Sequence, residues 1–120
     1  MTVLEMLDLT ENKLTALPPS IGKLEFLSQL FISRNEITAL PAEVGQMKCL
    51  HDLDAVRNHI SSVPATLGQL HQLRKMSLAS NRIKELPEEL AGLSKLVDLD
   101  LYVVLSINNH SFRMLLHGLA

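Results

Sequence analysis

Four asparagines at equal spacing constrain the fold more than any other feature of this sequence. Asn12, Asn35, Asn58 and Asn81 follow one another at intervals of 23 residues. Each stands in the same frame of leucine-like residues, so the chain repeats one structural unit. A fixed period of about 20 to 50 residues is typical of solenoids, in which each unit packs only against its neighbours. The asparagine spacing therefore predicts an array of stacked units.

The frame around each asparagine predicts a strand followed by a turn. Full units begin at residues 4, 27, 50 and 73, and a fifth begins at 96. The frame of the first unit reads Leu4, Leu7, Leu9, Asn12, Leu14, Leu17-Pro18 and Ile21. In Leu7-Asp8-Leu9 apolar and polar residues alternate, as a half-buried strand requires. Pro18 lacks a backbone donor, so regular strand pairing ends before it.

This skeleton, L-x-x-L-x-L-x-x-N-x-L, resembles that of the leucine-rich repeat family over residues 4 to 101. The resemblance implies an α/β solenoid, a leucine-rich repeat arc. Its concave face would carry a short-stranded parallel sheet, and its convex face would carry turns or short helical segments. We therefore expect a repeat array over residues 1–101 and a divergent C-terminal tail or makeshift cap over residues 102–120.

The repeated asparagines are predicted to be structural. An asparagine side chain has both donors and acceptors, so it can pair with backbone groups that a bend leaves unpaired. A row of such side chains would form a ladder inside the turn. The predicted ladder residues are Asn12, Asn35, Asn58 and Asn81.

The pattern breaks at both ends of the chain. Leu4 already begins a unit, so we expect no N-terminal capping segment, although terminal repeats need a polar outer face. After Leu101 the register is lost, and Val104 stands where a fifth asparagine would fall. Residues 102–120 are interpreted either as a makeshift cap or as the tail of a longer array that was interrupted by a splice or gene-model boundary.

Composition argues against several partners. Lys and Arg number 11 against 13 Asp and Glu, and no run of like charges suggests a nucleic-acid or membrane surface. The most apolar stretch, Leu99 to Ile107, is far shorter than the ~20 residues that span a bilayer. Glu5 and Asp8 interrupt any signal peptide, and the single Cys49 cannot form an internal disulfide. These features favour a soluble cytoplasmic protein.

The sequence contains no pattern that indicates catalysis. Phosphate-binding, dinucleotide-binding and zinc-protease motifs are absent, and the five histidines lack metal-ligand spacing. We therefore expect no enzyme activity, no cofactor, no metal and no small-molecule substrate.

The inner face of the predicted sheet is the candidate surface for binding a protein. Outward side chains of adjacent strands stand in columns ~4.8 Å apart, and their identities vary from unit to unit. Aromatic and arginine side chains are enriched at binding hot spots. The candidate residues are Phe31, Ser33, Arg34, Asp52, Asp54, Val56 and Arg57. The alternative is that the charges pair with one another and the phenylalanine lies flat on its neighbours.

The 23-residue unit and its Leu-Pro step are similar to those of the intracellular Ras-group leucine-rich repeat proteins, which include Ras-suppressor and Raf-activating scaffold types. That similarity implies a cytoplasmic, non-enzymatic scaffold for protein binding, sometimes one that engages small GTPases or phosphatases in signal transduction. Two alternatives stay open. The chain is the recognition part of a multidomain enzyme such as a kinase or ubiquitin ligase, or it is a truncated product without a function of its own.

Overall fold

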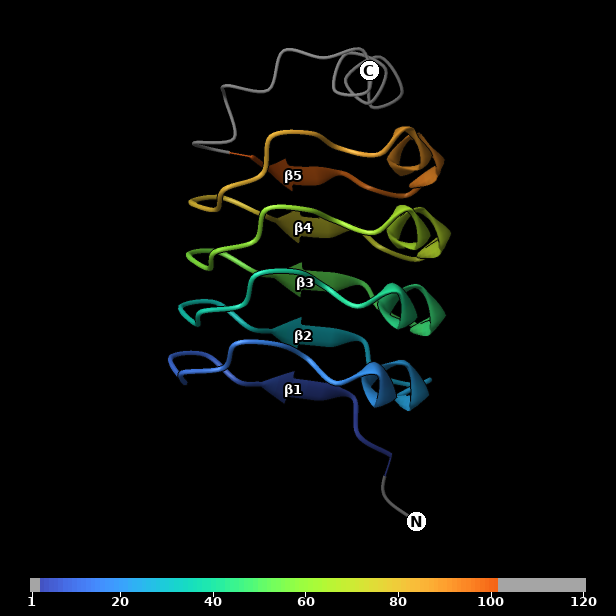
Figure 1. Ribbon diagram of the computed structural model, residues 1–120. Coiled ribbons are helices and arrows are strands. Elements are labelled where there is room, and N and C mark those ends of the chain that lie inside the picture. The colour runs from blue at the N-terminus through green and yellow to red at the C-terminus, as the bar shows by residue number, and fades with distance from the viewer. Residues whose placement is uncertain (1–2, 102–120) are drawn as a thin grey trace.

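A computed structural model of the chain, which describes residues 3–101, contains one parallel sheet. Its five strands are hydrogen-bonded in sequence order, β1-β2-β3-β4-β5, and stack along the length of the molecule (Figure 1). Each strand has three residues, and their bounds are β1 Met6–Asp8, β2 Gln29–Phe31, β3 Asp52–Asp54, β4 Lys75–Ser77 and β5 Asp98–Asp100. The interpretations of Val104 and of residues 102–120 lie outside the described residues.

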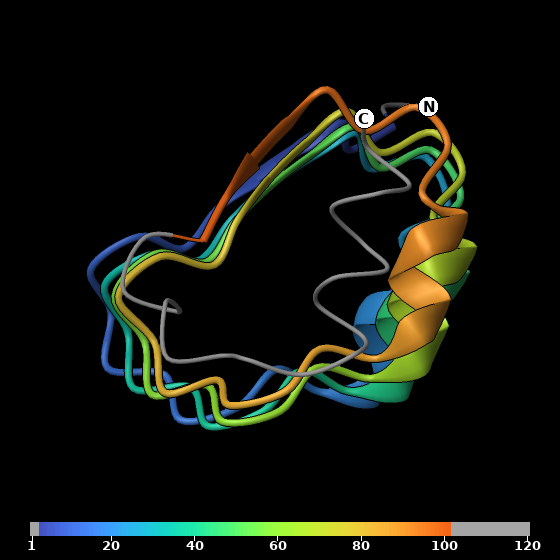
Figure 2. The same ribbon diagram turned by 90° about the horizontal axis from the view of Figure 1, so that it is seen from above.

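One short 3₁₀ helix follows each of the first four strands and lies on the other side of the stack from the sheet (Figure 2). The helices are η1 Pro19–Lys23, η2 Ala42–Gln46, η3 Ala65–Gln69 and η4 Glu88–Gly92. The predicted leucine-rich repeat arc, with short strands on one face and short helical segments on the other, is confirmed.

The proline of each Leu-Pro step has a role beyond ending the strand pairing. Pro18 is the N-cap of η1, with φ −71° and ψ 150°, and its carbonyl accepts a hydrogen bond from the Ile21 amide at 3.0 Å. Pro41, Pro64 and Pro87 cap the other three helices in the same conformation. Because proline fixes φ near this value and needs no donor partner, it sets where each helix begins.

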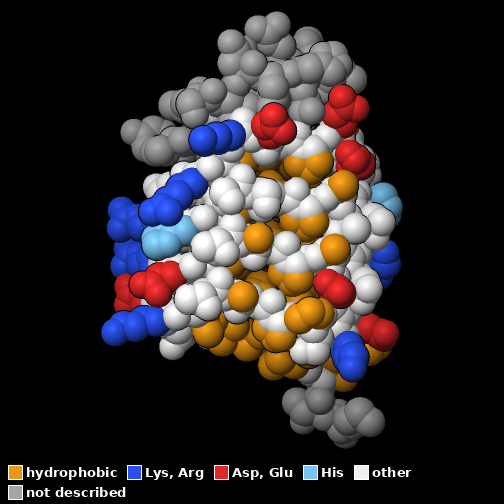
Figure 3. Space-filling model, viewed as in Figure 1, with side chains coloured by type: hydrophobic (Ala, Val, Ile, Leu, Met, Phe, Trp, Pro, Cys, Tyr) orange, Lys and Arg blue, Asp and Glu red, His pale blue; other side chains and the backbone are white. Residues whose placement is uncertain are grey.

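The core is a set of apolar rows that run through successive units. Leu7, Leu30, Leu53, Met76 and Leu99 occupy one row, because each strand pairs with the next at the same register. Leu30 and Leu53 are fully buried, whereas Leu7 of the first unit is only partly buried. Apolar side chains also form a band along the face seen in Figure 3, with charged side chains towards its margins. Burial therefore depends on stacking, since one unit cannot cover its own leucines.

Asparagine side chains link each unit to the one before it. Asn58 Nδ2 donates to the carbonyl of Ala55 in its own unit at 3.2 Å and to that of Ile32 in the preceding unit at 2.9 Å. Its Oδ1 accepts from the amide of Ile37 at 3.1 Å. Asn35 and Asn81 make the equivalent bonds, and all three side chains are buried.

Asn12, in the first unit, is exposed and bonds within that unit. Its Nδ2 donates to the carbonyls of Leu9 at 2.8 Å and Thr10 at 3.4 Å. Asn35, Asn58 and Asn81 differ from Asn12 because each has a preceding unit within residues 3–101 to which it can bond.

Candidate functional site

The first and third residues of every strand point away from the core and form what we call the sheet face. One row of the sheet face holds Met6, Gln29, Asp52, Lys75 and Asp98, and the other holds Asp8, Phe31, Asp54, Ser77 and Asp100. These rows are the columns that the 23-residue period predicts. Their members differ in size and charge from one strand to the next, so the side chains of this face, unlike those of the core, are not repeated from unit to unit.

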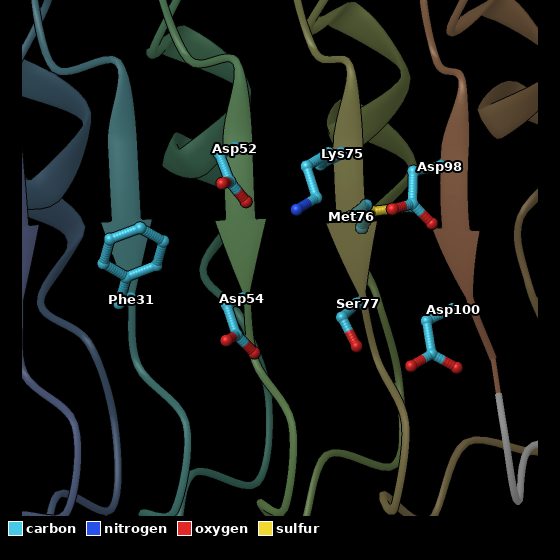
Figure 4. A pocket seen from close by; sticks show the side chains of 8 residues that line it. All are labelled: Phe31, Asp52, Asp54, Lys75, Met76, Ser77, Asp98 and Asp100. Carbon is cyan, nitrogen blue, oxygen red and sulfur yellow. The ribbon is translucent and has the colours of Figure 1, made fainter.

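A pocket of about 400 Å³ lies in the sheet face over β2 to β5. The side chains that line this acidic pocket are Phe31, Asp52, Asp54, Lys75, Met76, Ser77, Asp98 and Asp100 (Figure 4). Four carboxylates and one ammonium group therefore share it. Since a carboxylate accepts hydrogen bonds and an ammonium donates them, the pocket presents mainly acceptors to a ligand.

Two aspartates of the sheet face are held by the turn that follows their strand. Asp54 Oδ1 accepts from the amide of Val56 at 3.1 Å, and Asp8 Oδ1 accepts from the amide of Thr10 at 3.0 Å. Hydrogen bonds from the side chain and backbone of Thr10 lower the pKa of Asp8. These bonds fix the carboxylates at the ends of β1 and β3.

Asp52 lies in a less favourable environment for a charge. Burial raises the pKa of its carboxyl, Lys75 opposes the shift, and the negative charges of Asp54 and Asp98 add to it. The charged form of Asp52 is therefore less stable in the folded protein than in the unfolded chain.

We expect Asp52→Asn to stabilise the fold at neutral pH and Asp8→Asn to destabilise it. A raised pKa means that the Asp52 charge opposes folding above its folded-state pKa, and this effect disappears as the pH falls below the ordinary value of 3.8. The lowered pKa of Asp8 gives stability that is present above 3.8 and is lost as the pH falls through its folded-state pKa. Thermal unfolding of both variants from about pH 3 to about pH 8 measures whether each substitution raises or lowers the melting temperature relative to the wild type. Equal changes in melting temperature in the same direction would contradict the environments described for Asp8 and Asp52.

Three of the predicted binding residues, Phe31, Asp52 and Asp54, line the acidic pocket. Phe31 is partly buried, and its ring lies on the sheet face beside Asp54 (Figure 4). Ser33 and Val56 lie after the ends of β2 and β3, are also partly buried, and are not among the lining residues. The structure thus gathers the aromatic ring and the acidic residues and places the rest at the edge of the sheet face.

Arg34 and Arg57 occupy the turn that follows β2 and β3, in a left-handed backbone conformation with φ of 57° and 58°. Glu11 and Ser80 take the same conformation in the first and fourth units. Arg34 Nη1 donates to Glu11 Oε1 at 2.6 Å, so its ion-pair partner is a residue of the same row and not Asp52 or Asp54. Both side chains are more than half exposed, and such a pair contributes only ~0–1 kcal/mol.

The sequence prediction missed several residues of the site. Lys75, Met76, Ser77, Asp98 and Asp100 complete the acidic pocket. The 23-residue alignment already places all of these except Met76 in the rows of Asp52 and Asp54. Outside the pocket, Phe26, which immediately precedes the first leucine of the second unit, is an apolar side chain that is 60% exposed. Its position carries Val3, Cys49, Gln72 and Lys95 in the other units, so no periodic signal identifies it.

Residues 3–101 contain neither a membrane-spanning helix nor a metal-binding cluster of side chains. No helix in this range has the length and apolar composition needed to cross a membrane. Within the same range, no three His, Cys, Asp or Glu side chains are grouped in a way that would hold a metal ion.

Each repeat contributes one parallel strand, and a short helix follows each of the first four strands. Together with the buried asparagines of the second, third and fourth repeats, this arrangement defines a leucine-rich solenoid. The chain belongs to the leucine-rich repeat family: the family model described as a leucine-rich repeat region matches residues 1–117. Comparison with curated protein sequences gave no significant match.

Solved structures of leucine-rich repeat proteins superimpose well on the chain. A leucine-rich repeat protein of Leptospira interrogans is 37% identical, with a TM-score of 0.85 over 93% of this chain and 29% of that one. An internalin of Listeria monocytogenes is 28% identical, with a TM-score of 0.76 over 93% and 32%. The leucine-rich repeat ectodomain of the Arabidopsis thaliana receptor kinase SOBIR1 is 26% identical, with a TM-score of 0.71 over 82% and 55%. The chain thus spans less than two thirds of each of these proteins.

Proposed function

We propose that the chain is a non-enzymatic interaction module that binds a protein partner through the sheet face. The observation that supports this proposal is the contrast between two kinds of row. Leu7, Leu30 and Leu53 repeat one residue type because the core requires it, whereas Phe31 and Asp54 occupy equivalent positions with unlike chemistry. Folding alone gives no reason for that variation, whereas recognition of a particular partner would account for it.

The dimensions of the site suggest a partner that extends beyond the acidic pocket. A stable interface usually buries ~800 Å² on each side. Five strands of three residues, ~4.8 Å apart and rising ~3.3 Å per residue, present only about 200 Å² in projection. The exposed Arg57 and the partly exposed Val56 lie next to β3 and enlarge the available surface. A partner seated on Phe31 would therefore also contact the turns that follow the strands.

We place this module in the cytoplasm, in signalling that involves small GTPases or phosphatases. The support is the similarity of its 23-residue unit, with the Leu-Pro step, to intracellular Ras-group repeats. We propose a protein as the partner, and not a nucleic acid, a membrane or a small-molecule substrate, because the formal net charge is −2 and no basic stripe runs along the sheet face.

A second candidate is the recognition part of a multidomain enzyme such as a kinase or ubiquitin ligase. It is favoured by the structural similarity to the leucine-rich repeat ectodomain of a receptor kinase. In that case the sheet face would have the same role, and catalysis would be encoded elsewhere. Reading the genomic locus beyond codon 101 distinguishes the two candidates. A truncated product without its own function is the third possibility, and detection of the stable soluble chain in its source cell would argue against it.

We expect Phe31→Ala combined with Arg57→Glu to abolish capture of the partner from source lysate while the melting temperature stays unchanged. Truncating one aromatic hot spot typically costs at least about 2 kcal/mol of binding, or about thirtyfold in affinity, and replacing Arg57 removes an exposed side chain of a type that is enriched at hot spots. Affinity capture with the wild type and the double variant side by side measures the effect. Glu89→Arg, on η4 away from the sheet face, is the control and is expected to capture normally. Unchanged capture by the double variant would refute this choice of face.

A further inference from the structure

Four aspartates flank β4 on the sheet face. Asp52 and Asp54 belong to β3, and Asp98 and Asp100 belong to β5. Lys75 and Ser77 stand between the two pairs (Figure 4). Adjacent strands are ~4.8 Å apart, so the two acidic pairs are about 10 Å apart across β4. A single ligand with two hydrogen-bond donor groups about 10 Å apart could therefore bind both aspartate pairs at once.

The acidic pocket is short of positive charge. Its lining includes four carboxylates and one ammonium group, which leaves an excess of three negative charges. The core does not require this arrangement, because the aspartates point away from it. Mutual repulsion contributes to the raised pKa of Asp52. A cation placed in the pocket would relieve that repulsion.

Ser77 supplies a second, independent indication of a ligand. Its Oγ is buried, yet it makes no hydrogen bond with the residues that the structure describes. A buried hydroxyl without a partner is unfavourable by about 1–3 kcal/mol. In the pocket this hydroxyl lies between the carboxylates of Asp54 and Asp100 (Figure 4). A ligand that brings N–H donors to this point would give the hydroxyl a partner, once the serine side chain turns towards it.

Phe31 closes the pocket on the side of β2, next to Asp54 in the row. An aromatic face attracts a cation, and a planar guanidinium can stack on it while its N–H groups point at a carboxylate. A guanidinium also binds a carboxylate through two parallel hydrogen bonds, which an ammonium cannot do. The combination of Phe31 with paired aspartates therefore suits arginine better than lysine.

We propose that the acidic pocket binds arginine side chains of a basic, extended segment of the partner protein. This inference rests on the proposed function and specifies the chemistry of the partner. One guanidinium stacks on Phe31 and binds Asp54, and a second binds the Asp98 and Asp100 pair across β4. The Lys75 ammonium repels other positive charges from the space above β4. The two arginines therefore bind on either side of that strand.

The test uses three labelled nine-residue peptides in which every second residue is arginine, lysine or glutamate and the rest are alanine. Fluorescence anisotropy with the full chain, at about 0.15 M salt, gives the dissociation constants, because exposed charges more than ~8 Å apart are largely screened there. We expect the arginine peptide to bind at least about tenfold more tightly than the lysine peptide, and the glutamate peptide not to bind. Equal affinity for arginine and lysine, or no binding of the arginine peptide, would overturn the inference.

Two double variants with the same change of charge locate the binding. Asp52→Asn with Asp98→Asn removes two carboxylates of the pocket, and Glu25→Gln with Glu89→Gln removes two exposed carboxylates outside it. We expect the first variant to weaken the arginine peptide about tenfold or more and the second to change it less than about twofold. Equal weakening would show non-specific attraction and would also overturn the inference.

The two proposals fail in different ways. If the aspartate variant still captures the partner from lysate but the Phe31→Ala, Arg57→Glu variant does not, the sheet face binds a partner of other chemistry and only the arginine assignment is lost. If both variants capture it as the wild type does, the proposed function itself is wrong.

Discussion

Replacing Asn58 with alanine is expected to lower the free energy of unfolding by about 2 to 4 kcal/mol. The substitution removes the acceptor of the buried Ile37 amide and the one inter-unit bond that Asn58 Nδ2 donates, to the carbonyl of Ile32. The carbonyl of Ile32 keeps its bond from Asn35, so the Ile37 amide is the group left without a partner. An unpaired buried amide and the cavity beside it account for the expected loss. Urea unfolding followed by circular dichroism measures it.

Asn12→Ala is the matched control for that substitution. Asn12 is exposed and bonds only within its own unit, to the carbonyls of Leu9 and Thr10. Water replaces these bonds easily, so the expected loss is below about 1 kcal/mol. Similar losses at Asn12 and Asn58 would mean that the inter-unit bonds do not stabilise the stack.

Replacing Gly68 with alanine is expected to destabilise the fold by about 1 to 3 kcal/mol. A Cβ at this position would collide with the carbonyl oxygen of Glu89 in the next unit, which is backbone and cannot rotate away. None of the glycines of residues 3–101 has a positive φ, so close approach of the next unit is the reason for glycine here. The same approach occurs at Gly22, where a Cβ would lie 2.6 Å from the carbonyl oxygen of Glu43. Differential scanning calorimetry of the variant measures the effect.

Gly92→Ala tests the explanation, since among residues 3–101 an added Cβ there would meet only the Gly68 oxygen at 3.4 Å, an ordinary contact. We expect this variant to be as stable as the wild type or up to about 1 kcal/mol more stable, because alanine restricts the unfolded chain. If the two alanine variants lost the same stability, crowding between units would not be the cause.

The fold was predictable because the repeat period and the alternation within each unit fix the strand register. Residues 23 apart pair in every strand, and Leu30 and Leu53 are buried as the alternation requires. The Leu-Pro step predicted a turn but not the 3₁₀ helix that begins there, because the proline conformation suits either structure.

The candidate site was only partly predictable. Phe31, Asp52 and Asp54 were identified by residue type and position, and they line the pocket. The pairing of Arg34 with Glu11 depends on the left-handed turn after each of the first four strands. Non-glycine residues rarely adopt this conformation, and the repeat period does not indicate it. Asp98 and Asp100 were missed because the prediction selected residues near the aromatic and arginine side chains. It did not follow the rows of Asp52 and Asp54 to the last strand.

The most direct test of binding through the sheet face is an NMR titration that follows the backbone amide shifts of the labelled chain as the captured partner is added. Binding through this face predicts that the largest shift changes fall in β2 to β5 and in the turns that contain Arg34 and Arg57. The amides of η1 to η4, on the other side of the stack, should change little. Changes concentrated in η1 to η4, with the strands unaffected, would contradict it.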